Sequence, residues 1–163
     1  MGMMLPPNLV TILQDLGYNW PEADETKLLQ MGQSWTGFSG QMGQPVADAH
    51  ASAQQVWSAN QGQAIDAFLQ AWNHPRGPHA NLRDAATGGT GIGIGLMACA
   101  GIVLALKINV IVQLVTLAIE LVEAIATAPV TFGASLLEVP VFKEITQMLI
   151  NLAINLAMNA IMG

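Results

Sequence analysis

Two long stretches of this chain carry apolar side chains at alternating spacings of three and four residues, and this periodicity constrains the fold most strongly. Such spacing places a continuous seam along one face of an α-helix that packs lengthwise on another helix. The first stretch follows Trp20 and the second follows Ala80. No segment alternates apolar and polar residues as a half-buried strand would. The sequence therefore predicts an all-α fold, an elongated helical bundle.

The first seam predicts a helical hairpin. Its first helix runs from Pro21 to about Ala59, and it opens with a proline and carboxylates that suit the first turn of a helix. The segment Trp57–Gly62 favours a chain reversal, and the returning helix runs from about Gly62 to Asn73. We expect a kink or a break near Pro45. The start of the helix comprises Trp20, Pro21, Glu22, Asp24 and Glu25. The seam and the turn comprise Trp35, Phe38, Met42, Trp57, Gly62, Phe68 and Trp72.

We expect the seam side chains Trp35, Phe38 and Met42 to be buried against the returning helix. The second seam predicts one long helix from about Ala80 to Ala126. Residues 7–16 predict a short amphipathic helix that ends at Gly17. Thr127–Pro140 is expected to be a connection, followed by a last helix over about 141–161. The whole chain, 1–163, is expected to form a single helical domain with a hairpin part, 1–79, and an apolar long-helix part, 80–163.

The second half is apolar enough to raise the question of a membrane. Gly91–Leu106 has no charged side chain, but its sixteen residues fall short of the roughly 20 that a spanning helix needs, and Lys107 closes the run. Polar side chains then recur on one helix face, which is unfavourable against lipid. A bundle helix with one wet face fits this pattern, and so does a helix that lines a pore. The polar stripe comprises Asn109, Gln113, Glu120 and Glu123, and then Gln147, Asn151, Asn155 and Asn159 on the last helix.

Several functional classes conflict with the sequence. The net charge is −6 and the five basic residues are scattered, which argues against nucleic-acid binding. The glycine-rich run Gly88–Gly95 lacks the spacing of a phosphate-binding loop. His74 and His79 flank a turn without further metal ligands, and His50 is expected to be a solvated or capped surface residue. No nucleophile is paired with a base. We therefore expect no enzyme, no catalytic residue, no metal site and no cofactor.

The hairpin motifs resemble a known family. They are Trp20–Glu25 at the helix start, Trp35 in mid-helix, Val56–Ser58 at the turn, and Gln63–Phe68 with Trp72 on the return. Together with the residue pattern of Lys107–Ser135, they are similar to the WXG-like N-terminal domains of actinobacterial polymorphic toxins exported by type VII (ESX) secretion. This group includes the mycobacterial channel protein that carries a necrotising toxin. The resemblance covers most of the chain.

The resemblance implies a non-enzymatic targeting and assembly domain built on a WXG-like helical hairpin. It would pair with small WXG-type helical proteins, engage the type VII secretion machinery and deliver a toxin cargo fused after residue 163. It also implies a secreted or cell-surface location, and the segment Met1–Pro6 lacks the basic region of a secretory signal peptide. The alternative function is a membrane-inserting domain whose apolar helices form a pore or channel.

Overall fold

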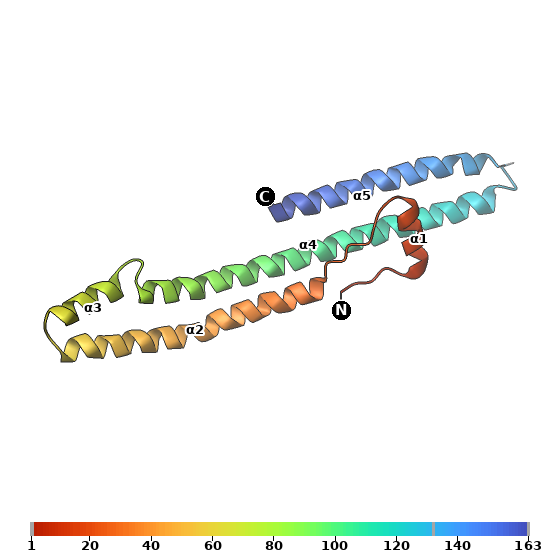
Figure 1. Cartoon of the computed structure of the whole chain (residues 1–163). Helices are drawn as coiled ribbons and strands as arrows, with labels where there is room; N and C mark the ends of the chain where they lie inside the picture. The colour runs from red at the N-terminus through yellow and green to blue at the C-terminus, as the bar shows by residue number, and fades with distance from the viewer. Residues whose placement is uncertain (1, 132, 163) are drawn as a thin grey trace. The chain divides into compact units, whose positions relative to one another are not determined.

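The structure is a computed structural model that describes residues 2–131 and 133–162, and within these residues it is helical without any strand (Figure 1). The prediction of an all-α fold with long helices is confirmed. The elements are α1 (Pro7–Asp15), α2 (Glu25–Ala59), α3 (Gln63–Asn73), α4 (Pro78–Thr127), the 3-10 helix η1 (Ala134–Glu138) and α5 (Val139–Met162). The chain divides into two compact units. One comprises the described residues up to Lys27 and from Cys99 onward, and the other is Leu28–Ala98.

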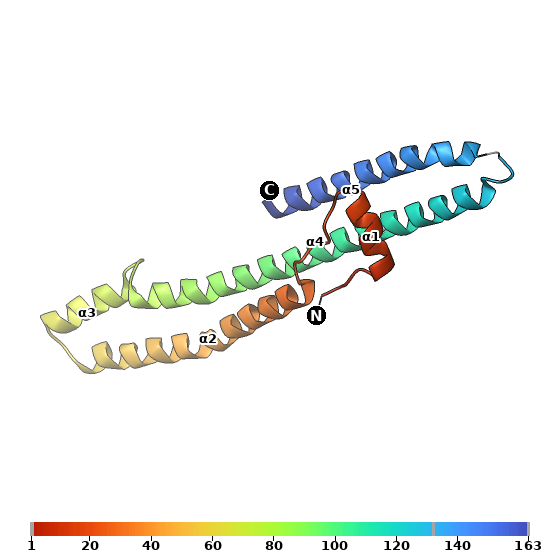
Figure 2. The ribbon, with the colours of Figure 1, turned by 45° about the vertical axis from the view of Figure 1, so that its right-hand side comes forward.

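The first unit has an apolar core built by α1, the second half of α4, and α5. In both views α5 runs back along α4, and α1 lies across them (Figures 1 and 2). Leu114 and Leu117 of α4 are fully inaccessible to solvent. The core comprises Leu5, Leu9, Leu13, Leu16, Val110, Leu114, Leu117 and Ile150. Burial of such leucine side chains contributes about 1.5–3 kcal/mol each.

The short helix α1 ends where the sequence predicts. Gly17 adopts a φ of +84°, the left-handed region that favours glycine at a helix C-terminus. The Gly17 amide donates to the Gln14 carbonyl at 2.9 Å, and the Tyr18 amide donates to the Leu13 carbonyl at 3.1 Å. These two bonds form a Schellman motif. They satisfy carbonyls that the helix end would otherwise leave free and turn the chain toward the segment before α2.

The second unit is held together by a close approach of two helix backbones. A Cβ atom built on Gly32 of α2 would lie 2.7 Å from the Gly93 carbonyl oxygen of α4. A Cβ atom built on Gly93 would lie 2.7 Å from the Gly32 carbonyl oxygen. One turn further along, Gly89 faces the hydroxyl of Ser39, which is buried and has no hydrogen-bond partner among the described residues. Small residues therefore form this helix contact.

The seam predicted for α2 lies on the wrong face of the helix. Trp35 and Phe38, predicted to be buried, are 39% and 46% exposed. Met42 is half-buried. The buried positions recur every seven residues instead: Glu25, Gly32, Ser39, Val46 and Ala53. The correction has a physical reason: small side chains allow α2 to approach α4 more closely than bulky aromatic side chains would.

The start of α2 also differs from the prediction. The helix begins at Glu25, so Trp20, Pro21, Glu22 and Asp24 precede it. Asp24 is the cap, because its carboxylate oxygen Oδ1 accepts a hydrogen bond of 3.0 Å from the backbone amide of Lys27. This bond lowers the pKa of Asp24 below its ordinary value. The predicted break at Pro45 is absent, since α2 continues through this residue.

The long helix α4 matches its predicted extent closely, and α3 and α5 lie within two residues of theirs. The seam predicted for α4 is half right; it comprises Leu82, Ala85, Gly89, Ile92, Leu96, Cys99, Val103, Leu106 and Val110. Gly89 and Val110 are buried as expected, whereas Ile92 is exposed and Gly93 takes its place in the contact. The chain between α2 and α3 passes through Gly62, whose φ is +116°. The single domain over 1–163, with its parts 1–79 and 80–163, stays a prediction.

Candidate functional site

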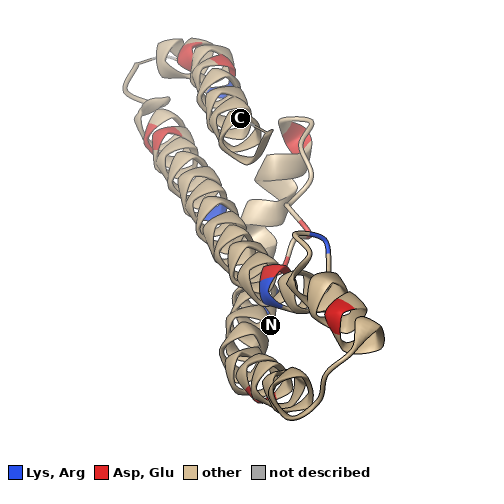
Figure 3. Cartoon of the chain, turned by 90° about the vertical axis from the view of Figure 1, so that its left-hand side faces the viewer, with Lys and Arg blue, Asp and Glu red and all other residues tan. Residues whose placement is uncertain are grey.

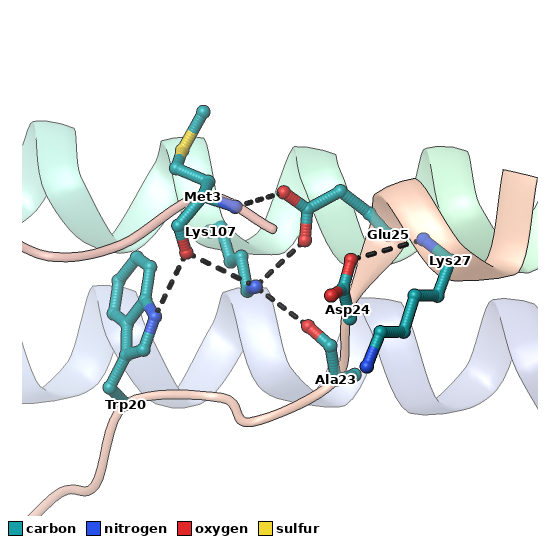
Figure 4. A network of polar contacts seen from close by, with 7 residues as sticks. All are labelled: Met3, Trp20, Ala23, Asp24, Glu25, Lys27 and Lys107. Atoms are coloured by element: carbon teal, nitrogen blue, oxygen red, sulfur yellow. Dashed lines mark hydrogen bonds and ion pairs between the residues drawn. The ribbon is translucent and has the colours of Figure 1, made fainter. Parts of the chain in front are cut away.

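One buried charge organises the N-terminal segment of the first unit. The Nζ atom of Lys107, on α4, donates to Glu25 Oε2 at 2.7 Å and to the Ala23 carbonyl at 2.7 Å (Figure 4). It also donates to the Met3 carbonyl at 3.3 Å. The side chain of Lys107 is 3% exposed and that of Glu25 is 11% exposed. All three protons of the ammonium group therefore have acceptors, as a buried lysine requires.

Two further contacts extend this network. The Glu25 carboxylate accepts a hydrogen bond from the Met3 amide, and the Trp20 indole N–H donates to the Met3 carbonyl at 3.3 Å (Figure 4). The Lys107 ammonium lies 5.7 Å from the centroid of the Trp20 ring, within range of a cation–π interaction. Trp20 precedes the helix whose start it was predicted to form, whereas Glu25 is the first residue of α2 as well as part of this network. Both residues fasten the N-terminal segment to α4. We name this network the Lys107 clamp.

The clamp makes stability depend on pH in the acid range. The hydrogen bond from Lys107 and then the amide of Met3 lower the pKa of Glu25 below its ordinary value of 4.5. A lowered pKa means that this stabilisation is complete above pH 4.5 and is lost as the pH falls through the lowered pKa. We expect the melting temperature of the parent protein to fall below pH 4.5 more steeply than that of Glu25→Gln. Equal slopes in calorimetry at pH 3–7 would contradict this assignment.

The outer face of α2 carries an uncovered apolar strip in the second unit. Met31, Trp35 and Phe38 are all exposed, and the Trp35 and Phe38 rings meet edge to face with centroids 6.1 Å apart. The literal Trp-X-Gly of the chain, Trp35–Gly37, therefore lies in mid-helix on this face. We name Met31, Trp35 and Phe38 the α2 strip.

A second group of rings lies where α2, α3 and α4 meet in the same unit. The predicted turn and return residues Trp57, Phe68 and Trp72 come together there. His50 is half-buried among them and accepts a hydrogen bond from Trp72, so of the two alternatives predicted for it the solvated surface residue is wrong. His79 joins the group from α4.

The polar stripes are only partly solvent-facing. Asn109, Glu123, Asn151, Asn155 and Asn159 are exposed as expected, while Gln113 and Glu120 are half-buried. Gln147 departs from the stripe, because its amide donates to the Leu16 carbonyl at 3.0 Å and thereby binds α5 to the end of α1. Charged residues are sparse along all the helices (Figure 3).

Two helical regions are long and apolar enough to cross a membrane by length and composition. They are Gln63–Thr127, which contains α3 and α4, and Ala134–Met162, which contains η1 and α5. Only 22% and 11% of their most apolar windows are buried. An apolar groove of about 320 Å³ runs between α4 and α5, with Asn109 and Gln113 among its lining residues. The surface of the first unit is thus largely apolar.

These features fit a helical domain that works by association, and the sequence comparison identifies its family. The model of the WXG100 like domain matches residues 5–149. The chain belongs to the WXG100-like family. WXG100-like domains are typical of type VII secretion and pair with helical partners. No curated protein and no solved structure matches this chain. This WXG100-like chain is therefore a helical protein related to type VII secretion, a system that exports proteins from the cell.

Two functional features of this WXG100-like chain escaped sequence reasoning. The Lys107 clamp joins residues 82 positions apart, which leaves no local signal. A lone lysine in a long apolar run, however, indicates a buried partner whenever the run is part of a soluble core. The ring group could have been found from the shared aromatic character of His50, Trp57, Trp72 and His79 around the predicted turn.

Proposed function

We propose that this chain is a non-enzymatic targeting and assembly module of type VII secretion that pairs with small WXG-type helical proteins. The α2 strip carries this proposal, because its three large apolar side chains are exposed. Contiguous apolar patches on soluble proteins commonly mark interaction sites. Tryptophan is enriched among the residues that dominate binding energy. Residues at helical spacing match a partner helix laid along α2.

The proposed role extends to delivery. The partner complex would bring the chain to the type VII secretion machinery, and a toxin cargo fused after residue 163 would be exported with it. Membership of the WXG100-like family and the resemblance of the hairpin motifs support this role. A secreted enzyme reporter, fused after residue 163 and expressed with and without the partner, tests it. Export that needs neither the partner nor the secretion system would overturn it.

The α2 strip gives a direct test of pairing. We expect Trp35→Ser with Phe38→Ser to weaken binding to a small WXG-type partner protein by roughly 1,000-fold, since hot-spot residues contribute about 2 kcal/mol or more each. The free energy of unfolding should change by less than about 1 kcal/mol, because both side chains are exposed in the unbound chain. Titration calorimetry and chemical denaturation measure the two effects.

The matched control for the strip is Ile125→Ser, which removes an exposed side chain of α4 in the other unit. It should leave affinity unchanged. If the double variant binds the partner as tightly as the parent does, the α2 strip is not the docking surface. A loss of several kcal/mol of stability would instead show that Trp35 and Phe38 serve the fold.

Membrane insertion is the second candidate function, favoured by one specific observation. Lys107, predicted to close the apolar run, is directed inward to Glu25 and is buried. Between Ala85 and Ile119 it is the only charged residue, so the outer face of α4 carries no charge over this span. Such a face is compatible with lipid once its length exceeds about 20 residues.

Dye release decides between the two candidates. The targeting proposal predicts that the purified chain, alone or with its partner, releases no dye from vesicles of phosphatidylethanolamine and phosphatidylglycerol. Reproducible release would favour insertion. In that case Glu120→Leu with Glu123→Leu should remove the cation preference of any channel in planar bilayers, because carboxylate rings confer that preference. In the targeting module the same change should only lower solubility.

A further inference from the structure

The ring group of the second unit contains two histidines in direct contact. The imidazoles of His50 on α2 and His79 on α4 are stacked with centroids 4.5 Å apart and planes 25° apart. The Trp72 ring of α3 stacks on His79 with a centroid distance of 5.9 Å. The ring of Trp57 meets His50 edge-on at 6.0 Å. The group thus joins α2, α3 and α4.

Helix α3 depends on this ring group for its attachment. None of its residues is fully buried. Its half-buried apolar side chains are Ile65, Phe68, Leu69 and Trp72. Phe68 lies between Trp57 and Trp72, with centroid distances of 5.9 Å to each. An 11-residue helix is marginal without tertiary contacts, so loss of these rings would free it.

One hydrogen bond in the group requires an unprotonated imidazole. The Trp72 indole Nε1–H donates to His50 Nδ1 at 3.1 Å. Nδ1 accepts only when it carries no proton, and the indole can only donate. A proton at Nδ1 would place two donors against each other. A second proton on His79 would then stack two cations at the 4.5 Å separation of the rings.

The surroundings offer no charge that would hold a protonated ring in place. Besides His50 and His79, the charged and titratable groups of this unit, Leu28–Ala98, are Asp48 on α2, Asp66 on α3, Arg83 and Asp84 on α4, and His74 and Arg76 in the turn before α4. All six side chains are exposed. None forms an ion pair with His50 or His79, since the ion pair within the described residues joins Lys107 and Glu25.

We propose that His50 and His79 form a pH switch that releases α3 from α2 and α4 between pH 7.5 and pH 5. Histidine is the side chain whose charge ordinarily changes in this range. The closed state uses neutral His50, so its stability is present at neutral pH and is lost on acidification. Opening exposes the rings of Trp57, Phe68 and Trp72. This inference stands apart from the secretion role.

Hydrogen exchange on the full chain tests the switch. The readout is the protection factor of the α3 amides, corrected for the intrinsic exchange rate at each pH. We expect a fall of roughly tenfold from pH 7.5 to pH 5, as loss of one half-buried hydrogen bond implies. The amides around Leu114 and Leu117, in the other unit, should keep their protection. Glu25 does not interfere, because its lowered pKa places its titration below pH 4.5.

The chain has three histidines, so the variants isolate the switch. His50→Asn retains an acceptor near the Nδ1 position without a titrating ring, and it should abolish most of the fall. His79→Phe retains stacking and should reduce the fall. His74→Asn, outside the ring group, is the matched control and should behave as the parent does.

An unchanged protection factor in the parent would overturn the proposal, and so would a parent-like fall in His50→Asn. If His50→Asn leaves α3 unprotected already at pH 7.5, His79→Phe decides. A fall equal to that of the parent in this variant contradicts the paired switch, and a smaller fall supports it.

Discussion

Lys107→Met should lower the free energy of unfolding by about 3–5 kcal/mol, the usual effect of breaking a buried ion pair from one side. The change leaves the Glu25 carboxylate buried, and it removes the donor from the carbonyls of Ala23 and Met3. The N-terminal segment should then detach from α4. Urea denaturation followed by circular dichroism measures the loss of stability, and limited proteolysis before α2 measures the detachment.

Two further variants make this prediction specific to the clamp. Lys27→Met removes an exposed lysine of α2 and should change stability by no more than about 0.5 kcal/mol. Lys107→Met combined with Glu25→Leu should be more stable than Lys107→Met alone, because it removes the unpaired charge. Simple additivity of the two losses, or a Lys107→Met variant as stable as Lys27→Met, would contradict the clamp.

Helix positions could be predicted from the sequence because local signals set them. Gly17 ends α1 and Gly62 lies in the turn before α3, both as predicted, while Pro78 opens α4 two residues before the predicted start at Ala80. Each of these residues acts through its own backbone preference, so no distant contact is needed. The start of α2 was predicted wrongly because two residues offer suitable local signals for it, Pro21 and Asp24. The helix starts after Asp24, whose carboxylate accepts a hydrogen bond from the Lys27 backbone amide.

The packing face of α2 could not be read from apolar periodicity. Two sets of residues, one containing Trp35 and Phe38 and the other Gly32 and Ser39, both have helical spacing. Hydrophobicity favours the first set, but the close backbone approach at Gly93 selects the second. Likewise, the meaning of Lys107 depends on Glu25, a residue far away along the chain.

The glycine contact that selects this face predicts the second large effect. Gly93→Ala should lower the free energy of unfolding by about 1–3 kcal/mol, as overpacking a tight contact does. The new methyl carbon would lie 2.7 Å from the Gly32 carbonyl oxygen and 2.6 Å from the Cγ2 atom of Thr36. The clash is relieved only if α2 moves away from α4, which loses the close contact between the two helices. Thermal and urea denaturation measure the effect.

Gly95→Ala is the matched control, because a Cβ atom at this position of α4 has nothing within 4 Å. This substitution should stabilise the chain by about 0.5–1 kcal/mol through helix propensity alone. The opposite signs two residues apart are the signature of a close helix contact. Gly32→Ala combined with Gly93→Ala should lose less stability than the sum of the two single variants, since either methyl group already separates the helices. If Gly93→Ala instead stabilises the chain as Gly95→Ala does, α2 and α4 do not meet through their glycines, and the apolar face with Trp35 regains its place as the seam.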